Sequence, residues 1–209
     1  DPASYESPDK ADVTKSPTPR FDLLRFGSYN HIGVQWCRGC PFNCEFCDII
    51  ELFGRVPRAK GTEQMLKEMQ TLYDLGYRGH VDLVDDNFIG NKKLVKQFLP
   101  HLKTWLEERD WPFEFTTEAS INLADDEELM RLMREVGFFA VFVGIESPDE
   151  DTLKAMQKKQ NTRRSIAESV EKMYQAVWSR ISSGSLTVLQ HAGPPGHLGF
   201  PCRGHRLAE

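Results

Sequence analysis

The sequence of 209 residues has no apolar run approaching the roughly 20 residues needed to span a bilayer, and its N-terminus lacks the charged and apolar regions of a signal peptide. It also lacks an excess of positive charge. The formal net charge of -5 provides no broad field to attract phosphate backbones or anionic lipid. We therefore predict a cytoplasmic protein that has no membrane span and binds no nucleic acid. The missing initiator methionine indicates a fragment of a longer protein.

Cysteine is scarce outside one short segment. Four of the five cysteines lie between residues 37 and 47, and the fifth is Cys202. A disulfide framework would distribute its cysteines across the fold, whereas crowded cysteines in a cytoplasmic chain are typical of metal or cluster ligands. The segment 37–47 is therefore the first candidate for a functional site.

The chain has three parts. Residues 1–20 are polar and rich in proline, which indicates a linker or an extended arm. Over residues 21–176, strand patterns alternate with amphipathic helix patterns. The expected strands are 31–36, 80–84, 113–117 and 138–145. Helices between successive strands imply right-handed crossovers and a parallel sheet, so we predict an α/β fold, either an open doubly wound sheet or a barrel.

Polar side chains follow each expected strand. The cysteine loop comes after the first strand, and the later strands are followed by Asp85, Asp86 and Asn87, then Glu118, then Glu146. Open parallel sheets and barrels both carry their chemistry at the carboxyl ends of the strands. This placement favours an enzyme over a structural module.

Cys40, Cys44 and Cys47 have the spacing Cys-x3-Cys-x2-Cys. Thiolates in so short a loop suit an iron-sulfur cluster, and three of them leave one iron of a 4Fe-4S cubane open. Two alternatives add Cys37 as a fourth ligand: an iron-sulfur electron-transfer module, and a structural zinc-binding module, although zinc sites usually separate their ligand pairs by about a dozen residues or more. Cys37 ends an apolar strand, where a free cysteine often packs as a small hydrophobe.

Longer stretches of the chain carry a family resemblance. These stretches are HIGVQWCRGCPFNCEFCDIIELFGRVPR, GYRGHVDLVDDNFIGNKK, FTTEASINLADD and FFAVFVGIESPDEDTLKAMQKKQNTRRS. Together with the cysteine spacing, they resemble the radical S-adenosylmethionine (SAM) superfamily, in the cobalamin-associated branch that includes hopanoid-modifying methylases. The resemblance covers roughly residues 18–176.

The resemblance implies a partial TIM-like (βα) barrel that holds a 4Fe-4S cluster on Cys40, Cys44 and Cys47, with SAM on the open iron. In this family, an electron from the cluster cleaves SAM to methionine and a 5'-deoxyadenosyl radical, which leads to hydrogen abstraction or methyl transfer. We expect a small-molecule or lipid-like substrate and an electron donor such as a flavodoxin or ferredoxin. Cobalamin is expected only if the full-length protein has an upstream domain, because the ligation sequence Asp-x-His-x-x-Gly is absent.

The same resemblance implies contacts to SAM. Phe46 is expected to pack near the adenine, with ordinary loop packing as the alternative. Residues 85–87 are expected to touch the SAM amino group, with a helix N-cap or a solvated turn as the alternative. Glu118 and Glu146 are expected to accept hydrogen bonds from the SAM ammonium or ribose hydroxyls, and the alternative for each is a structural salt bridge.

The C-terminal part departs from the family pattern. A basic run is predicted to form a solvated face, with a substrate or cofactor contact as the alternative, and consists of Lys158, Lys159, Arg163 and Arg164. Residues 177–209 are predicted to be irregular, because VWSRISSGSL stands where the family would show Ala-Gly-x-Glu and an apolar strand. One base lost at the Ala-Gly junction restores that pattern in the displaced frame, so we expect a frame-shifted tail, with a divergent native tail as the alternative. The barrel then stops after about four strand-helix units, and the histidines and Cys202 of this tail are not ligands.

Overall fold

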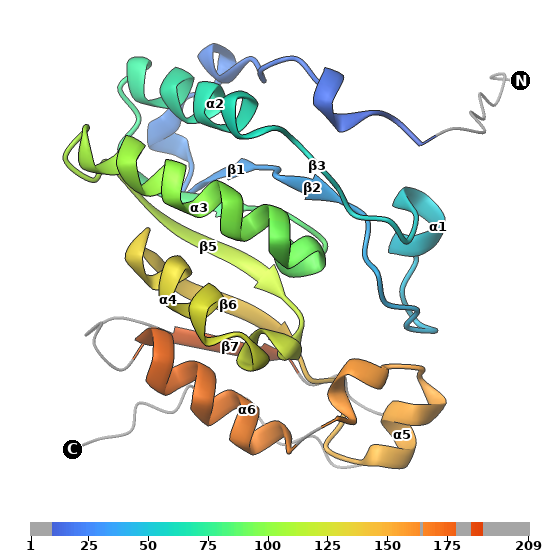
Figure 1. Cartoon of the computed structure of the whole chain (residues 1–209). Coiled ribbons are helices and arrows are strands. Elements are labelled where there is room, and N and C mark those ends of the chain that lie inside the picture. Colours follow the sequence, from blue (N-terminus) through green and yellow to red (C-terminus); the bar gives the residue numbers. More distant parts are fainter. Residues whose placement is uncertain (1–9, 164, 179–184, 190–209) are drawn as a thin grey trace, which may run out of the picture.

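The strands form one parallel sheet. The computed structural model describes residues 10–163, 165–178 and 185–189. Its five-stranded sheet has the order β1-β4-β5-β6-β7, and every neighbouring pair is parallel. These strands are β1 (Ile32–Val34), β4 (Gly79–Leu83), β5 (Phe113–Ala119), β6 (Phe138–Gly144) and β7 (Ser185–Leu189). All point toward the end of the molecule that carries α1 and α5 (Figure 1).

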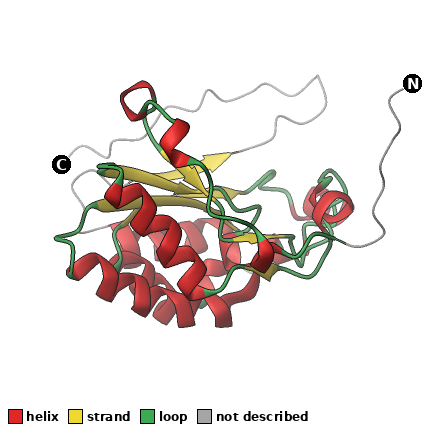
Figure 2. Cartoon of the chain, turned by 90° about the horizontal axis from the view of Figure 1, so that it is seen from above, coloured by secondary structure: helices red, strands yellow, loops and turns green. Residues whose placement is uncertain are grey.

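Four helices connect the strands and cover one face of the sheet (Figure 2). They are α2 (Thr62–Asp74), α3 (Lys92–Glu107), α4 (Glu127–Glu135) and α6 (Ile166–Met173). Each has an apolar stripe at helical spacing, and that stripe faces the sheet. The result is four strand-helix units followed by a fifth strand, β7. None of the helices in the described ranges is long and apolar enough to cross a membrane.

The core lies between the sheet and these helices. Its largest fully buried side chains include Phe88, Phe98, Phe115 and Phe138. Full burial of such a side chain stabilises the fold by about 1.5–3 kcal/mol. Helix α4 begins after Asp126 because the side chain of this residue caps the helix, accepting a hydrogen bond from the Leu129 backbone N–H.

Small elements surround the cysteine segment. Strand β2 (Cys37–Arg38) pairs antiparallel with β3 (Arg58–Ala59), and helix α1 (Ile49–Phe53) lies in the connection between them. Short 3-10 helices occur at Val13–Lys15, Phe21–Leu23, Phe26–Ser28, Phe88–Asn91, Ile121–Asp125 and Lys159–Asn161, and the short helix α5 spans Glu150–Ala155.

The described part of the N-terminal segment lies against this region. Val13 is buried, and the Lys10 ammonium donates to the backbone carbonyls of Glu51 and Leu52 in α1. Residues 10–20 therefore run along the domain as an extended segment with one short helical turn. Residues 1–9 lie outside the described residues, and the boundary at residue 20 stays a prediction.

The C-terminal part requires a correction. Residues 177–209 were expected to be irregular, but Tyr174–Trp178 form a π-helical turn after α6, and Ser185–Leu189 form β7. Strand β7 pairs in register with β6 from Ala140 to Gly144, because the backbone groups along that edge of β6 can be satisfied by one more parallel strand. Residues 179–184 and 190–209, with His191, His197, Cys202 and His205, lie outside the described residues, and the frame shift stays a prediction.

Candidate functional site

The cysteine loop, residues 37–47, makes a tight turn directly after β2. Gly39 has a φ of +97°, and a Cβ at this position would lie 2.8 Å from the Gly54 carbonyl oxygen. The next backbone N–H, of Cys40, donates to the same carbonyl at 3.3 Å. Only glycine allows this left-handed backbone and this close approach together. The turn therefore fixes the backbone position of Cys40, the first of the three spaced cysteines.

Asp85 anchors the start of the loop. Its Oδ1 accepts hydrogen bonds from the backbone N–H groups of Trp36 and Cys37, both at 2.8 Å. The side chain is almost fully buried, and its Oδ2 has no hydrogen-bond partner among the described residues. Burial raises the pKa of the Asp85 carboxyl to about 8, although the two N–H groups act in the opposite direction. The residue that we expected at the SAM amino group thus also holds β1 to the loop after β4.

The two residues after Asp85 reach the same loop. Asp86 Oδ2 accepts from the Gly39 backbone N–H at 3.1 Å. Asn87 Nδ2 lies 3.8 Å from Cys40 Sγ and 3.1 Å from Ser120 Oγ, and Asn87 Oδ1 accepts from the Ser120 backbone N–H. The ends of β1, β4 and β5 are therefore joined through residues 85–87. Whether these residues also contact SAM stays a prediction.

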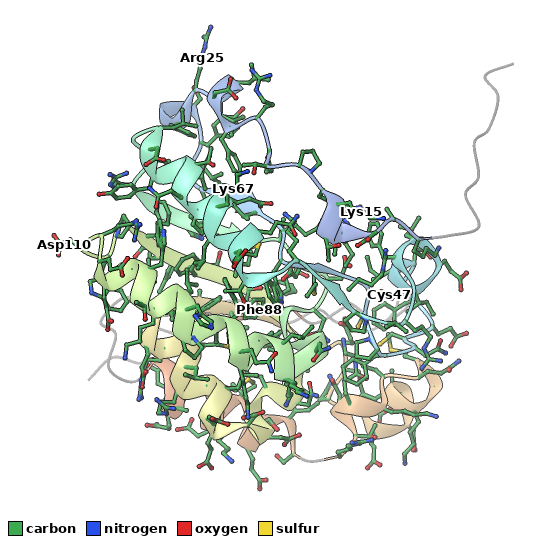
Figure 3. The ribbon with its side chains drawn as sticks, turned by 45° about the horizontal axis from the view of Figure 1, so that its top comes forward. Lys15, Arg25, Cys47, Lys67, Phe88 and Asp110 are labelled. Atoms are coloured by element: carbon green, nitrogen blue, oxygen red, sulfur yellow. The ribbon has the colours of Figure 1, made fainter. Side chains whose placement is uncertain are left out.

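The three spaced cysteines lie together on this loop and are partly buried; Figure 3 shows Cys47 within it. Burial raises the pKa of the Cys40 thiol, and the nearby Cys44 and Cys47 raise that pKa further. Two sulfurs accept hydrogen bonds from side-chain amides: Cys40 from Asn87, and Cys44 from Gln160 Nε2 at 3.5 Å. Such N–H donors stabilise cysteine sulfurs that carry negative charge, as ligand thiolates do.

Cys37 has a different environment from the other three. It belongs to the hydrophobic core with 2% of its surface exposed, and its thiol donates to the Asn87 carbonyl at 3.7 Å. Burial raises the pKa of the Cys37 thiol well above its ordinary value, and the carboxylates of Asp85 and Asp86 add to this. Cys37 is packed in the core, whereas the other three cysteines are partly exposed, and this argues against the four-cysteine alternatives. Among the described residues, no three His, Cys, Asp or Glu side chains are grouped to hold a single metal ion.

Glu146 and Lys158 form a buried ion pair beside Phe46. Lys158 Nζ lies 2.6 Å from Glu146 Oε1 and 5.4 Å from the centre of the Phe46 ring. Glu146 has a φ of +67°, and a Cβ on Gly144 would lie 2.5 Å from Glu146 Oε1, so glycine makes room for the pair. Phe46 keeps 41% of its surface exposed. The salt-bridge alternative that we considered for Glu146 is thus present in the structure.

The other predicted glutamate, Glu118, is exposed at the end of β5. Its neighbours Phe115, Thr117 and Ala119 point into the core, so Glu118 lies on the face of the sheet opposite to the helices. Partial burial raises the pKa of the Glu118 carboxyl, and Asp82 and Asp86 raise it further. This carboxyl therefore lies on the face opposite to the helices and near Asp86 in the loop after β4.

The structure corrects one expectation and adds residues that the sequence did not indicate. Lys158 is buried rather than part of a solvated face, because Glu146 lies opposite it; Lys159 and Arg163 are exposed as expected, and Arg164 lies outside the described residues. The contacts of Ser120 and Gln160 were not predicted. A serine or a glutamine alone has no motif that could reveal such a contact.

The family model described as the Radical SAM superfamily matches residues 34–196. The chain belongs to the radical SAM superfamily. The predicted resemblance is therefore confirmed. Relatives support the same branch: the chain is 57% identical over 168 residues to an uncharacterized methyltransferase from Synechocystis sp., and 42% identical over 166 residues to a hopanoid C-2 methylase from Rhodopseudomonas palustris. These matches cover 80% and 79% of this chain but only 31% and 32% of the relatives, so the chain spans about a third of their length.

Solved structures confirm the predicted fold class. The radical SAM methyltransferase TsrM from Kitasatospora setae, solved with cobalamin and a [4Fe-4S] cluster bound, matches with a TM-score of 0.64 and 18% identity, over 75% of this chain and 30% of that chain. The cobalamin-dependent SAM radical enzyme OxsB, solved with aqua-cobalamin bound, matches with a TM-score of 0.69 and 17% identity, over 86% of this chain and 26% of that chain. The parallel α/β sheet is thus of the radical SAM type.

Proposed function

We propose that this chain contains the catalytic core of a radical SAM enzyme, in which Cys40, Cys44 and Cys47 hold a 4Fe-4S cluster and SAM binds the iron that has no protein ligand. One observation carries the proposal: three cysteines share one loop at the ends of the strands, amides donate to two of their sulfurs, and Cys37 is withdrawn into the core. When bound, the cluster and SAM would supply reductive cleavage of SAM to methionine and a 5'-deoxyadenosyl radical, for hydrogen abstraction or methyl transfer.

The chain's own residues would bind and orient SAM. Phe46 presents a partly exposed ring next to the last cysteine, which suits packing against the adenine. Glu118 offers an exposed carboxyl at the end of β5, and the loop of residues 85–87 carries the partly exposed carboxyl of Asp86 and the buried one of Asp85. These groups suit the ammonium and ribose hydroxyl groups of SAM. The Glu146 carboxylate also lies at this end, although Lys158 already binds one of its oxygens.

The wider context is also part of the proposal. Residues 21–176 would form the catalytic core, residues 1–20 an arm, and residues 177–209 a frame-shifted tail. An electron donor such as a flavodoxin or ferredoxin would reduce the cluster, and the relatives named as methylases favour methyl transfer to a small or lipid-like molecule in the cytoplasm. Cobalamin would be a cofactor only if the full-length protein has an upstream domain that binds it.

Anaerobic reconstitution tests the proposal. The full chain should take up about four irons with matching sulfide, and SAM should change the EPR spectrum of the reduced cluster. A single tightly bound zinc without sulfide would overturn the cluster assignment. A loaded cluster whose spectrum ignores SAM would instead indicate an electron carrier.

A further inference from the structure

Residues 156–160, after α5, lie against the cysteine loop although they are more than a hundred residues away from it in sequence; Figure 1 shows the loop beside α5. Three hydrogen bonds join the two: the Glu45 backbone N–H to the Met156 carbonyl at 3.0 Å, Asn43 Nδ2 to Gln157 Oε1 at 2.9 Å, and Gln160 Nε2 to Cys44 Sγ at 3.5 Å. Only the last of these touches a cysteine sulfur. The cysteine loop is therefore held at a second place, besides the contacts that Asp85 makes with its start.

Gln160 is an unusual side chain for this position. It keeps only 7% of its surface exposed, and its Oε1 is buried with no hydrogen-bond partner among the described residues. A buried amide oxygen without a partner destabilises a fold, so an apolar side chain of similar size would serve stability better. The amide is explained if its N–H is needed at the Cys44 sulfur.

An N–H group at a ligand sulfur favours the reduced cluster. Reduction adds one electron, taken from an external reductant, and the extra negative charge spreads onto the sulfurs. A donor that faces a sulfur stabilises this charge more in the reduced state than in the oxidised state, so it raises the reduction potential. We propose, on the basis of the function proposed above, that Gln160 is a positioning residue that acts through Cys44 Sγ to raise the reduction potential of the cluster.

The other contacts of the segment give the proposal a matched control. Asn43 joins the same two pieces of chain as Gln160 does, and it is exposed and makes its contact with Gln157 rather than with a sulfur. Loss of Asn43 loosens the closure without removing an N–H···S bond. Loss of Gln160 removes that bond and also removes the unsatisfied buried oxygen.

The experiment compares Gln160→Leu, Gln160→Met and Asn43→Ala with the unmodified chain, each reconstituted with its cluster. Iron and sulfide are counted, and the one-electron midpoint potential is measured by anaerobic dithionite titration with EPR detection. Both Gln160 variants should load the cluster and show a lower potential, by about tenfold in the reduction equilibrium or about 59 mV. Asn43→Ala should keep the potential of the unmodified chain.

Each outcome decides a different question. An unmodified chain that takes up no cluster overturns the proposed function, and this inference with it. A loaded cluster with an unchanged potential in both Gln160 variants overturns the inference alone. An equal fall of the midpoint potential in Asn43→Ala and in the Gln160 variants also overturns the inference, because loosening of the cysteine loop would then explain the shift. Thermal unfolding of the cluster-free Gln160→Leu chain should show no loss of stability.

Discussion

Lys158 Nζ lies 2.6 Å from Glu146 Oε1, and both side chains are buried. Glu146 lies two residues after the end of β6. Lys158 lies in the segment after α5, twelve residues later in the sequence. Asn161 adds to this junction, because its Nδ2 donates to the carbonyls of Gly144 and Ile145. The end of β6 is thus fixed to the segment that closes the cysteine loop.

We expect Lys158→Met to destabilise the fold by about 3–5 kcal/mol, because it removes the buried ammonium that lies against the Glu146 carboxylate. The double variant Glu146→Gln with Lys158→Met should lose less, since no charge then remains. Urea denaturation measures the free energy of unfolding. Lys159→Met, an exposed neighbour, is the control and should change it by less than about 0.5 kcal/mol. Equal effects of Lys158→Met and Lys159→Met would contradict the importance of the pair.

Cysteine variants separate the cluster ligands from the core cysteine. Cys40→Ala, Cys44→Ala and Cys47→Ala should each lose the cluster, because two thiolates cannot hold a cubane in this loop. Cys37→Ser should keep it, since the Cys37 thiol packs in the core and donates to the Asn87 carbonyl. Iron and sulfide content after anaerobic reconstitution gives the result. Loss of iron in Cys37→Ser, with the fold intact by circular dichroism, would instead support the alternatives in which Cys37 is a fourth ligand.

Asp85 variants test the anchor of the cysteine loop. Asp85→Ala removes the acceptor of two buried backbone N–H groups and should destabilise the fold by about 2–4 kcal/mol. Asp85→Asn keeps an oxygen that can accept from the Trp36 and Cys37 N–H groups, so it should lose much less. The measurement is again the free energy of unfolding in urea. A smaller loss in Asp85→Ala than in Asp85→Asn would show that the two hydrogen bonds do not anchor the loop.

The same carboxyl predicts a dependence of stability on pH. Its pKa is about 8 in the folded chain and near the ordinary value of 3.8 in the unfolded chain, so the folded state binds the proton more tightly. Stability from this group is therefore fully present below pH 4 and falls as the pH rises toward 8. Between pH 5 and pH 8 the free energy of unfolding of the unmodified chain should fall by at most about 4 kcal/mol more than that of Asp85→Asn. Urea denaturation of both chains at the two pH values tests this. An equal fall in the free energy of unfolding for the unmodified chain and for Asp85→Asn would refute the raised pKa.

Much of the fold could be predicted because its elements have clear hydrophobic periods. The pattern of Leu94, Phe98 and Leu102 predicts α3, and the apolar run from Phe138 predicts β6. Strands β2 and β3 have two residues each, which is too short for any period. Strand β7 was missed because the sequence around it departs from the family pattern, although five residues are enough for backbone pairing with β6.

The candidate site shows a similar division. The spacing of Cys40, Cys44 and Cys47 is local and could be predicted, since the ligands of a cluster loop lie close together in the sequence. The amide donors to Cys40 and Cys44 are 47 and 116 residues from those sulfurs, and only the folded chain brings them there. The burial of Lys158 could not be predicted for the same reason. A basic run indicates a solvated face unless the position of its carboxylate partner is known.

The cysteine loop is made early in the chain, whereas the groups that hold it come much later. Asp85 follows Trp36 by 49 residues, and Gln160 follows Cys44 by 116 residues. Contacts at such separations form only after the intervening chain has closed on itself. On the ribosome, a nascent chain that already presents all three cysteines still lacks the side chains that support them. Arrested chains that end before residue 156 should therefore retain less iron than the full chain after the same anaerobic reconstitution.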